Sequence, residues 1–241
     1  MNDREKNIDT YFTNIRLTNA TLDVYLPRTS ILKAIKEQMP FFKGILLDVG
    51  CGIMPYRELI LNENKQVSKY IGLDLATSTI HKTDIADLHW DAVTIPLQEH
   101  TIDVVMATEV LEHSFEPDQT LNEIYRVLKP NGQFFFTVPF IWPLHEVPYD
   151  AYRYTPFSLK KHLEKAGFKN IEIRSLGGWH ASLAQMIGLW ITENKFTGFK
   201  KKMVTKIAKR IIRYLVKIDI PDHSFKQHTI TSGLYGTAQK L

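Results

Sequence analysis

The sequence contains almost no cysteine and no long uninterrupted apolar run. Cys51 is the only cysteine among 241 residues, which excludes a disulfide within one chain and a zinc site built from several thiolates. No window reaches the ~18 uncharged apolar residues of a membrane span, and residues 1–11 lack the apolar stretch of a signal peptide. Internal repeats and low-complexity linkers are also absent. We therefore predict a single cytoplasmic domain.

Charge is unevenly distributed along the chain. The formal net charge is +4, yet the segment from Lys195 to Lys217 holds nine basic residues and no acidic one, which leaves −5 for the rest. Apolar residues repeat at helical spacing through this segment, at Phe199, Met203, Ile207, Ile211 and Leu215. The pattern predicts a basic amphipathic helix over 199–217. It favours peripheral contact with an anionic surface, a phosphate-bearing acceptor, or a lid helix with a solvated outer face.

Apolar runs of strand length alternate with segments that can hold helices. This alternation is typical of a doubly wound α/β sheet with parallel strands. The predicted core strands are Gly44–Val49, Lys69–Leu75, Asp87–Asp91, Asp103–Thr108 and Gln133–Val138. The predicted helices are Thr29–Met39 with Thr29 or Ser30 as its N-cap, Asp118–Leu128, and a helix that Thr155 and Pro156 begin and that runs to Lys165.

Two further strands are predicted at Asn170–Ser175 and Thr229–Gln239, with helices over Trp179–Thr192 and Phe199–Lys217 between them. The core fold does not require this helical segment. We divide the single domain into an N-terminal helical lead-in (1–43), a cofactor-binding core (44–178), a helical lid or partner surface (179–228) and a last strand (229–241).

A glycine turn follows the first core strand, in the order Asp48-Val49-Gly50-Cys51-Gly52. Such a turn at the carboxyl end of a parallel strand lets a nucleotide-type ligand approach the backbone closely. A dinucleotide fingerprint needs a third glycine three positions after Gly52, where this chain has Pro55. An acid such as Asp48 suits a ligand with an ammonium group. These features favour S-adenosylmethionine over NAD. Cys51 is interpreted as a small residue that fits the turn.

Acids also end the next two predicted strands. Asp74, followed by Leu75, can accept hydrogen bonds from both ribose hydroxyls, and Asp91 can accept from an adenine amino group while Ala92 offers a backbone amide. A single strand-end aspartate is as often the cap of the following helix. Three of them beside a glycine turn favour a cofactor pocket.

Four motifs in order carry a resemblance to a known family: Leu47–Gly52, Ile95–Leu97 before Ile102–Val105, Glu109–His113, and Arg126–Gly132. The chain resembles the class I S-adenosylmethionine-dependent methyltransferases of the type 11 group over residues 46–239. The resemblance implies a Rossmann-like seven-stranded sheet whose last strand is antiparallel. It further implies cofactor contacts at Asp48, Gly50, Cys51, Gly52, Asp74, Asp91, Ala92, Thr108 and Glu109. Met54 stands where many members have a small residue.

The segment 139–155, after the fifth core strand, is dense in titratable and aromatic side chains. His145 is the predicted general base, with Glu146 or Asp150 as the orienting or alternative carboxylate. The predicted acceptor-binding residues are Trp142, Tyr149, Tyr152 and Arg153. The alternative interpretation is that these side chains only pack and hold the loop together.

The segment 145–155 is similar to that of methyltransferases encoded among surface-polysaccharide and other glycan biosynthesis genes. The similarity implies methyl transfer to a hydroxyl, or less favourably an amine, of a small or glycan-type acceptor. No metal site is predicted, because Pro148 would interrupt a zinc-protease helix and no histidine follows four positions after His145. Nucleic acid is not expected as a partner. The alternatives are an RNA methyltransferase, another small-molecule methyltransferase, and a non-catalytic subunit that binds S-adenosylmethionine.

Overall fold

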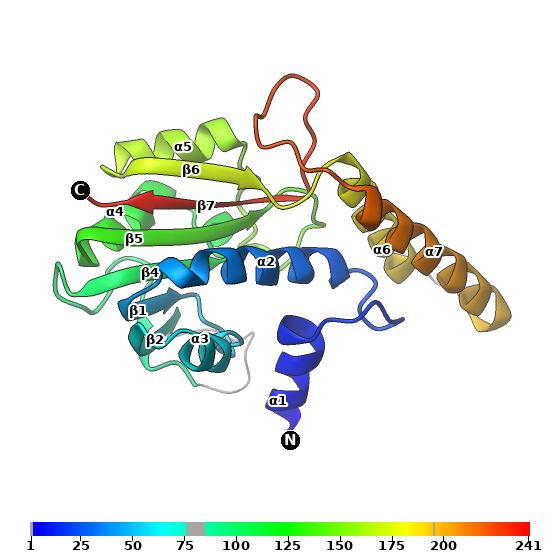
Figure 1. Cartoon of the computed structure of the whole chain (residues 1–241), viewed down its shortest axis with the longest axis horizontal. Helices are drawn as coiled ribbons and strands as arrows, with labels where there is room; N and C mark the ends of the chain where they lie inside the picture. The colour runs from blue at the N-terminus through cyan, green and yellow to red at the C-terminus, as the bar shows by residue number, and fades with distance from the viewer. Residues whose placement is uncertain (1, 76–84, 195) are drawn as a thin grey trace.

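The computed structural model describes residues 2–75, 85–194 and 196–241, which build a seven-stranded sheet in the order β3-β2-β1-β4-β5-β7-β6 (Figure 1). The neighbouring strands β3, β2, β1, β4 and β5 run parallel, whereas β7 pairs antiparallel with both β5 and β6. The predicted doubly wound α/β fold with an antiparallel last strand is confirmed. The strands are β1 Gly44–Val49, β2 Val67–Leu75, β3 Leu88–Trp90, β4 Ile102–Thr108, β5 Leu128–Pro139, β6 Lys169–Ser175 and β7 Gly233–Gln239.

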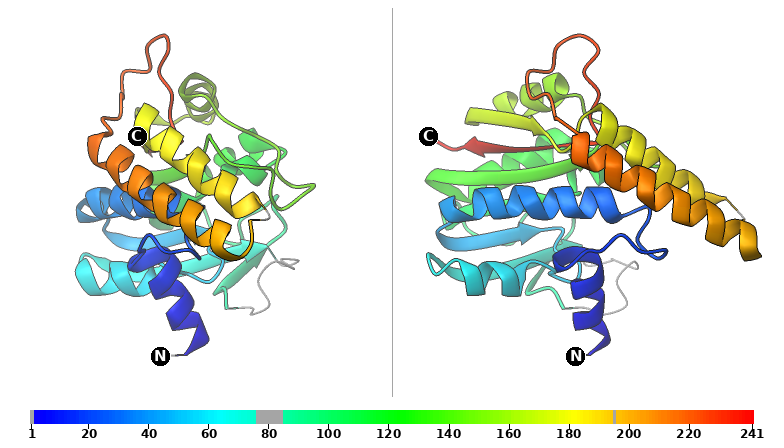
Figure 2. Two further views of the ribbon diagram at one scale, coloured as in Figure 1. Left: turned by 90° about the vertical axis from the view of Figure 1, so that its right-hand side faces the viewer. Right: turned by 45° about the vertical axis from the view of Figure 1, so that its right-hand side comes forward.

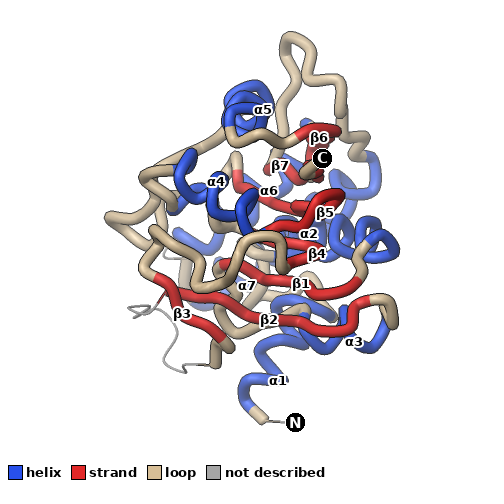
Figure 3. The backbone as a smooth tube through the Cα atoms, turned by 90° about the vertical axis from the view of Figure 1, so that its left-hand side faces the viewer, coloured by secondary structure: helices blue, strands red, loops and turns tan. Residues whose placement is uncertain are grey.

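The central strands are mostly apolar because both of their faces are buried. Consecutive side chains of a strand point to opposite faces, so Leu46 packs in one hydrophobic cluster and Leu47 in the other. Val104 and Val105 of β4 are divided in the same way. Helices cover both faces of the sheet, as Figure 3 shows from the amino ends of the parallel strands. The uninterrupted apolar runs of the sequence are thereby explained.

The helices α2 (Tyr25–Gln38) and α3 (Arg57–Glu63) pack on one face, and α4 (Pro117–Val127) and α5 (Pro156–Lys165) on the other. Thr155 caps α5 by accepting a hydrogen bond from the Ser158 amide at 3.2 Å, as predicted. The predicted cap of the first long helix was wrong. α2 already begins at Tyr25, and Thr29 lies inside it, with its hydroxyl donating to the Tyr25 carbonyl at 2.6 Å.

Two helices, α6 (Trp179–Glu193) and α7 (Gly198–Ile218), form a hairpin that extends past the carboxyl ends of the parallel strands (Figures 1 and 2). The chain then returns through a loop to β7, which begins at Gly233 and not at Thr229 as predicted. Residues before Gly233 turn instead of extending, because the Thr231 hydroxyl bonds to Ser175 and to the Gly233 carbonyl. Within the described residues, no helix is both long and apolar enough to cross a membrane.

Candidate cofactor and acceptor site

The glycine turn and the acid that ends β2 lie in direct contact. The amide of Gly52 donates to Asp74 Oδ2 at 2.9 Å, and the amide of Leu75 donates to Asp74 Oδ1 at 2.8 Å. Gly50 and Gly52 both have positive φ, at +66° and +50°, a conformation that strongly favours glycine. A Cβ atom on Gly50 would also lie 2.5 Å from a methyl group of Val110. The turn therefore requires glycine, and the two predicted parts of the cofactor pocket meet as expected.

Asp48 is a buried acid at the carboxyl end of β1, with 2% of its surface exposed. Its pKa is raised to about 7: burial raises it most, the Tyr70 hydroxyl, which donates to Asp48 Oδ2, lowers it, and the charge of Asp74 raises it. A buried carboxylate of this kind gains from a cationic ligand. The α-ammonium of S-adenosylmethionine is such a ligand, so the site fits the predicted cofactor. The sequence analysis did not predict a role for Tyr70, although a tyrosine beside the apolar residues of a core strand was a usable signal.

Cys51 and Met54 pack around the second strand. Cys51 is buried, and burial together with the negative charge of Asp48 raises the pKa of its thiol, so it lacks the features of a reactive cysteine. A Cβ atom on Gly72 would lie 2.5 Å from Met54 Sδ and 2.9 Å from Cys51 Sγ. Because Gly72 has no side chain, there is room for the large Met54 side chain at a position where many members of the resembled family have a small residue.

Asp91 lies in the loop after β3 and is fully exposed. Its Oδ1 accepts from the amides of Thr94 at 2.8 Å and Val93 at 2.9 Å, and these bonds lower its pKa. Asp91 Oδ1 therefore caps the backbone amides that follow it, in agreement with the alternative interpretation of a strand-end aspartate as a local cap. Contact of Asp91 and Ala92 with an adenine ring stays a prediction. Ala92 has a φ of +65°, so the loop turns sharply at this position.

Thr108 is the last residue of β4, and Glu109 follows it with a φ of +57°. The carboxylate of Glu109 accepts from the Thr137 hydroxyl of β5 at 2.8 Å. Burial raises the pKa of Glu109, while that hydrogen bond and the charge of Arg28 lower it. Glu109 thus lies at the carboxyl edge between the cofactor turn and the acceptor segment, where the resemblance places a cofactor contact.

The N-terminal segment lies against the glycine turn, which the sequence did not reveal. α1 (Asp3–Ile8) leads into a π-helical turn, η1 (Asp9–Thr13). Arg4 of α1 donates to the carbonyl of Ile53 at 2.9 Å. Phe12 of η1 meets the ring of Tyr56 edge-on with 6.1 Å between centroids, and the guanidinium of Arg28 lies 4.3 Å from the Phe12 centroid. We call residues 2–24 the N-terminal strap.

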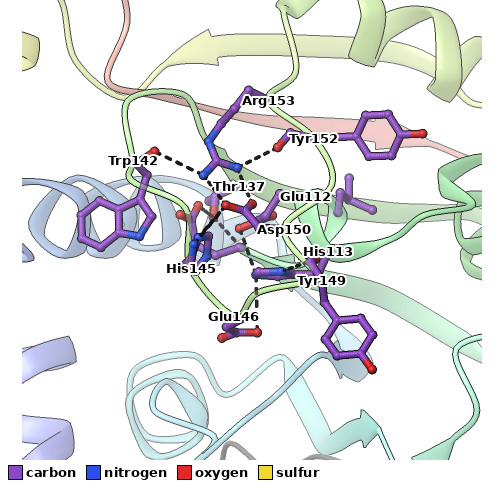
Figure 4. Close-up of polar contacts among 12 residues, drawn as sticks. Glu112, His113, Thr137, Trp142, His145, Glu146, Tyr149, Asp150, Tyr152 and Arg153 are labelled. Atoms are coloured by element: carbon purple, nitrogen blue, oxygen red, sulfur yellow. Dashed lines mark hydrogen bonds and ion pairs between the residues drawn. The ribbon is translucent and has the colours of Figure 1, made fainter.

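On the acceptor side, the predicted base and one predicted carboxylate form a pair (Figure 4). His145 Nδ1 lies 3.2 Å from Asp150 Oδ2, and the His145 amide also donates to that oxygen. Arg153 binds both oxygens of Asp150 and, at 3.3 Å, the carbonyl of Trp142. The Arg153 hydrogen bond lowers the pKa of Asp150 to about 2. Of the two predicted carboxylates, Asp150 is the one that pairs with His145, and Arg153 holds Asp150 and the loop in place.

Glu146 points to a second histidine. His113 Nε2 lies 3.7 Å from Glu146 Oε2 and 3.8 Å from Glu112 Oε1, and its Nδ1 lies 3.0 Å from the Tyr149 carbonyl. Glu112 is fully buried, neither of its carboxylate oxygens has a hydrogen-bond partner, and burial raises its pKa well above the usual range. No role was predicted for Glu112. Its position inside the Glu109–His113 motif was the signal that could have marked it as a site residue.

Ligand atoms of Glu112, His113 and His145 all lie within 4.8 Å of one another, close enough to share one metal ion. Glu112 and His113 come from one segment and His145 from another, so the argument from a zinc-protease helix does not apply to this group. A carboxyl group that burial keeps neutral needs no positive partner such as a metal ion. The absence of a metal stays a prediction.

The predicted acceptor-binding aromatics border a hollow of about 230 Å³ lined by Phe140, Trp142, Leu144 and residues 150–153. Tyr152 stacks on Tyr154 with 5.3 Å between centroids. Tyr149 is exposed and lies beside Phe115 rather than in the lining of the hollow. The structure thus brings Trp142, Tyr152 and Arg153 together, and Tyr149 lies apart from them.

Known proteins resemble this chain in both motif and fold. A family model described as a methyltransferase domain matches residues 47–136. A probable S-adenosylmethionine-dependent methyltransferase of Mycolicibacterium smegmatis is 29% identical over 160 residues, which cover 58% of each chain. A ubiquinone biosynthesis O-methyltransferase of Pseudomonas entomophila is 30% identical over 113 residues, 43% of this chain and 47% of that protein.

The crystal structure of a SAM-dependent methyltransferase from Archaeoglobus fulgidus shares the fold, with a TM-score of 0.57 and 18% identity over 92% of this chain and 97% of that one. The chain spans 58% of the length of the Mycolicibacterium relative and about half that of the Pseudomonas one. The match to the family model includes the glycine turn and the strand-end acids Asp74 and Asp91. The chain therefore has the fold of the class I methyltransferases and, over residues 47–136, a region that matches a methyltransferase domain, and these findings support S-adenosylmethionine as its cofactor.

Proposed function

We propose that the protein transfers a methyl group from S-adenosylmethionine to a hydroxyl of a small or glycan-type acceptor. The observation that carries the proposal is the His145–Asp150 pair, held at 3.2 Å in a loop at the carboxyl edge of the sheet. A hydroxyl is a poor nucleophile until a base takes its proton. A carboxylate on Nδ1 orients the imidazole and stabilises its charged form, which leaves Nε2 to accept that proton.

When bound, S-adenosylmethionine supplies an electrophilic methyl group on a sulfonium. Asp48 is placed to bind the ammonium end, and Asp74 the ribose hydroxyls. His145 Nε2 accepts the proton of the acceptor hydroxyl as its oxygen forms the new bond to the methyl carbon. The cofactor would supply the methyl carbon and would keep the electron pair of the former carbon–sulfur bond, which cancels its sulfonium charge. Asp150 then balances the charge of the His145 imidazolium.

One relative, the lining of the hollow and a sequence resemblance support a hydroxylated, glycan-type acceptor. The relative is a ubiquinone biosynthesis O-methyltransferase. The hollow beside His145 combines the aromatic rings of Trp142 and Tyr152 with the charged Arg153, a combination that suits a sugar ring and its polar substituents. The segment 145–155 is similar to glycan-pathway methyltransferases.

A reducing, cytoplasmic compartment suits the single buried thiol of Cys51.

The first test is isothermal titration with S-adenosylmethionine and S-adenosylhomocysteine, with NAD as the control ligand. Binding of the first two is expected, and Asp74→Ala should weaken it. Transfer of radiolabelled methyl groups to nucleotide sugars and lipid-linked sugars then tests the acceptor class.

His145→Gln should lower kcat by about 10²–10⁴-fold with little change in cofactor affinity. His162→Gln is the matched control, since His162 lies on α5 beside Asp118. A domain that binds cofactor but transfers methyl to none of these acceptors would favour the non-catalytic alternative. Transfer to RNA alone would favour an RNA methyltransferase.

A further inference from the structure

Large apolar side chains are exposed along both helices of the α6–α7 hairpin. On α6 they follow one another at intervals of four, three and four residues, which places them in one stripe along the helix. On α7 they again recur every three or four residues. We call this set the hairpin surface: Trp179, Leu183, Met186 and Trp190 on α6, and Phe199, Met203, Ile207, Ile211 and Tyr214 on α7.

The hairpin surface is separate from the faces by which the helices pack. α7 buries Ala208, Ile212 and Leu215 against α6 and the N-terminal strap. At about 100° per residue, these buried positions are centred about 130° around α7 from Met203 and Ile207. On α6, Gly188 approaches the strap so closely that a Cβ atom would lie 2.2 Å from the Leu22 carbonyl oxygen. Both helices are therefore fully packed on one side and apolar again on the other.

Basic side chains border the apolar stripe of α7. α7 contains no acidic residue. Seven of its lysines and arginines are exposed: Lys200, Lys201, Lys202, Lys206, Arg210, Arg213 and Lys217. The last five lie within about 80° around the helix, next to the sector of Met203 and Ile207. An apolar face bordered by lysine and arginine is typical of helices that lie in the interface of an anionic bilayer.

The free end of the hairpin carries aromatic rings and further lysines. Trp190 meets the ring of Phe196 edge-on with 5.3 Å between centroids, and the Lys200 ammonium lies 5.4 Å from the Phe196 centroid. Phe199 is the most exposed member of the hairpin surface, at 81%. Tryptophan and lysine favour the boundary between lipid headgroups and acyl chains. The end that projects furthest from the sheet is thus the part best suited to insert (Figure 2).

We propose that the α6–α7 hairpin docks the protein on an anionic lipid bilayer. A nucleic acid would use the basic residues but would leave the aliphatic side chains of the stripe in water. A bilayer uses both. The hairpin also contacts the acceptor loop, since Gln185 of α6 donates to the Ile141 carbonyl at 2.6 Å. Docking would bring that loop to the lipid surface. This inference goes beyond the proposed function and does not depend on it.

The test is flotation of the full chain with two kinds of vesicle, pure phosphatidylcholine and an equal mixture of phosphatidylcholine and phosphatidylglycerol. We expect at least about tenfold more protein on the anionic vesicles, and less as salt is raised. The charge variant Lys206→Glu/Arg213→Glu and the apolar variant Phe199→Ser/Ile207→Ser should each lose that binding. S-adenosylmethionine affinity, measured by titration, reports whether each variant is folded.

The matched controls lie on α5, away from the hairpin: Lys160→Glu/Lys161→Glu for charge and Phe157→Ser for apolar surface. They should float as the unaltered protein does. Equal binding to both vesicles, or equal loss in the α5 variants, would overturn the proposal. A chain that ignores vesicles but dimerises through Ile207 would also overturn it and assign the surface to a second copy. Because none of these readouts uses methyl transfer, failure of the proposed activity would leave the docking result intact.

Discussion

Cofactor affinity should rise with pH because Asp48 has to ionise before it can bind an ammonium group. Its pKa is raised to about 7 in the protein. With that value, the ionised fraction of Asp48 grows about 15-fold between pH 5.5 and 7.0. The cofactor's own α-amino group stays almost fully protonated over this range, since such groups titrate near ~7.8. The association constant for S-adenosylmethionine should therefore increase by about tenfold or more.

Isothermal titration at several pH values between these limits measures the effect. Asp48→Asn should bind more weakly and show no such slope, because its amide does not titrate. Tyr70→Phe removes the hydroxyl that donates to Asp48, so it should raise the pKa of Asp48 and move the curve to higher pH. The control Asp118→Asn makes the same change on α4 and should keep the slope of the unaltered protein. A flat profile in the unaltered protein, or a slope that persists in Asp48→Asn, would refute the reasoning.

The same carboxyl group should influence stability in the absence of cofactor. A pKa that is higher in the folded than in the unfolded chain means that the folded chain binds more protons, so folding stability falls as pH rises from about 4 toward 7. Thermal unfolding should show a larger loss of Tm over this range in the unaltered protein than in Asp48→Asn. Equal losses would indicate that burial does not raise the pKa of Asp48.

Three further perturbations test other parts of the structure. Gly72→Ala should lower the free energy of unfolding by about 1–3 kcal/mol, because its Cβ would overlap Met54 and Cys51; unchanged stability by denaturant titration would contradict the packing. Thr155→Ala should remove the cap of α5 and cost about 1 kcal/mol while S-adenosylmethionine affinity stays the same; a loss of affinity would contradict a purely local role. Dialysis against a chelator should leave methyl transfer unchanged. A loss that zinc or manganese restores would instead assign Glu112, His113 and His145 as ligands.

The sequence predicted the core strands and placed the strand-end acids beside the glycine turn, because uninterrupted apolar runs and turn residues act locally and parallel strands end at one edge. It did not predict contacts that join distant segments. Arg4 reaches Ile53, and Tyr70 reaches Asp48, through tertiary packing that leaves no periodic signal. The predicted start of α2 was wrong. The Tyr25 amide donates to the Thr21 carbonyl, so the helix begins without a side-chain cap that the sequence could show. In the segment 139–155, the sequence indicated Asp150 or Glu146 as the partner of His145 but did not predict the contact of Glu146 with His113.

The N-terminal strap links the residues that follow the glycine turn to the α6–α7 hairpin. At one end Arg4 lies on Ile53 and Phe12 on Tyr56. At the other end Asn19 accepts a hydrogen bond from Lys209 of α7 at 2.7 Å, and Leu22 lies against Gly188 of α6. Because one short segment makes both sets of contacts, a shift of the hairpin would be transmitted along the strap to the backbone beside the glycine turn.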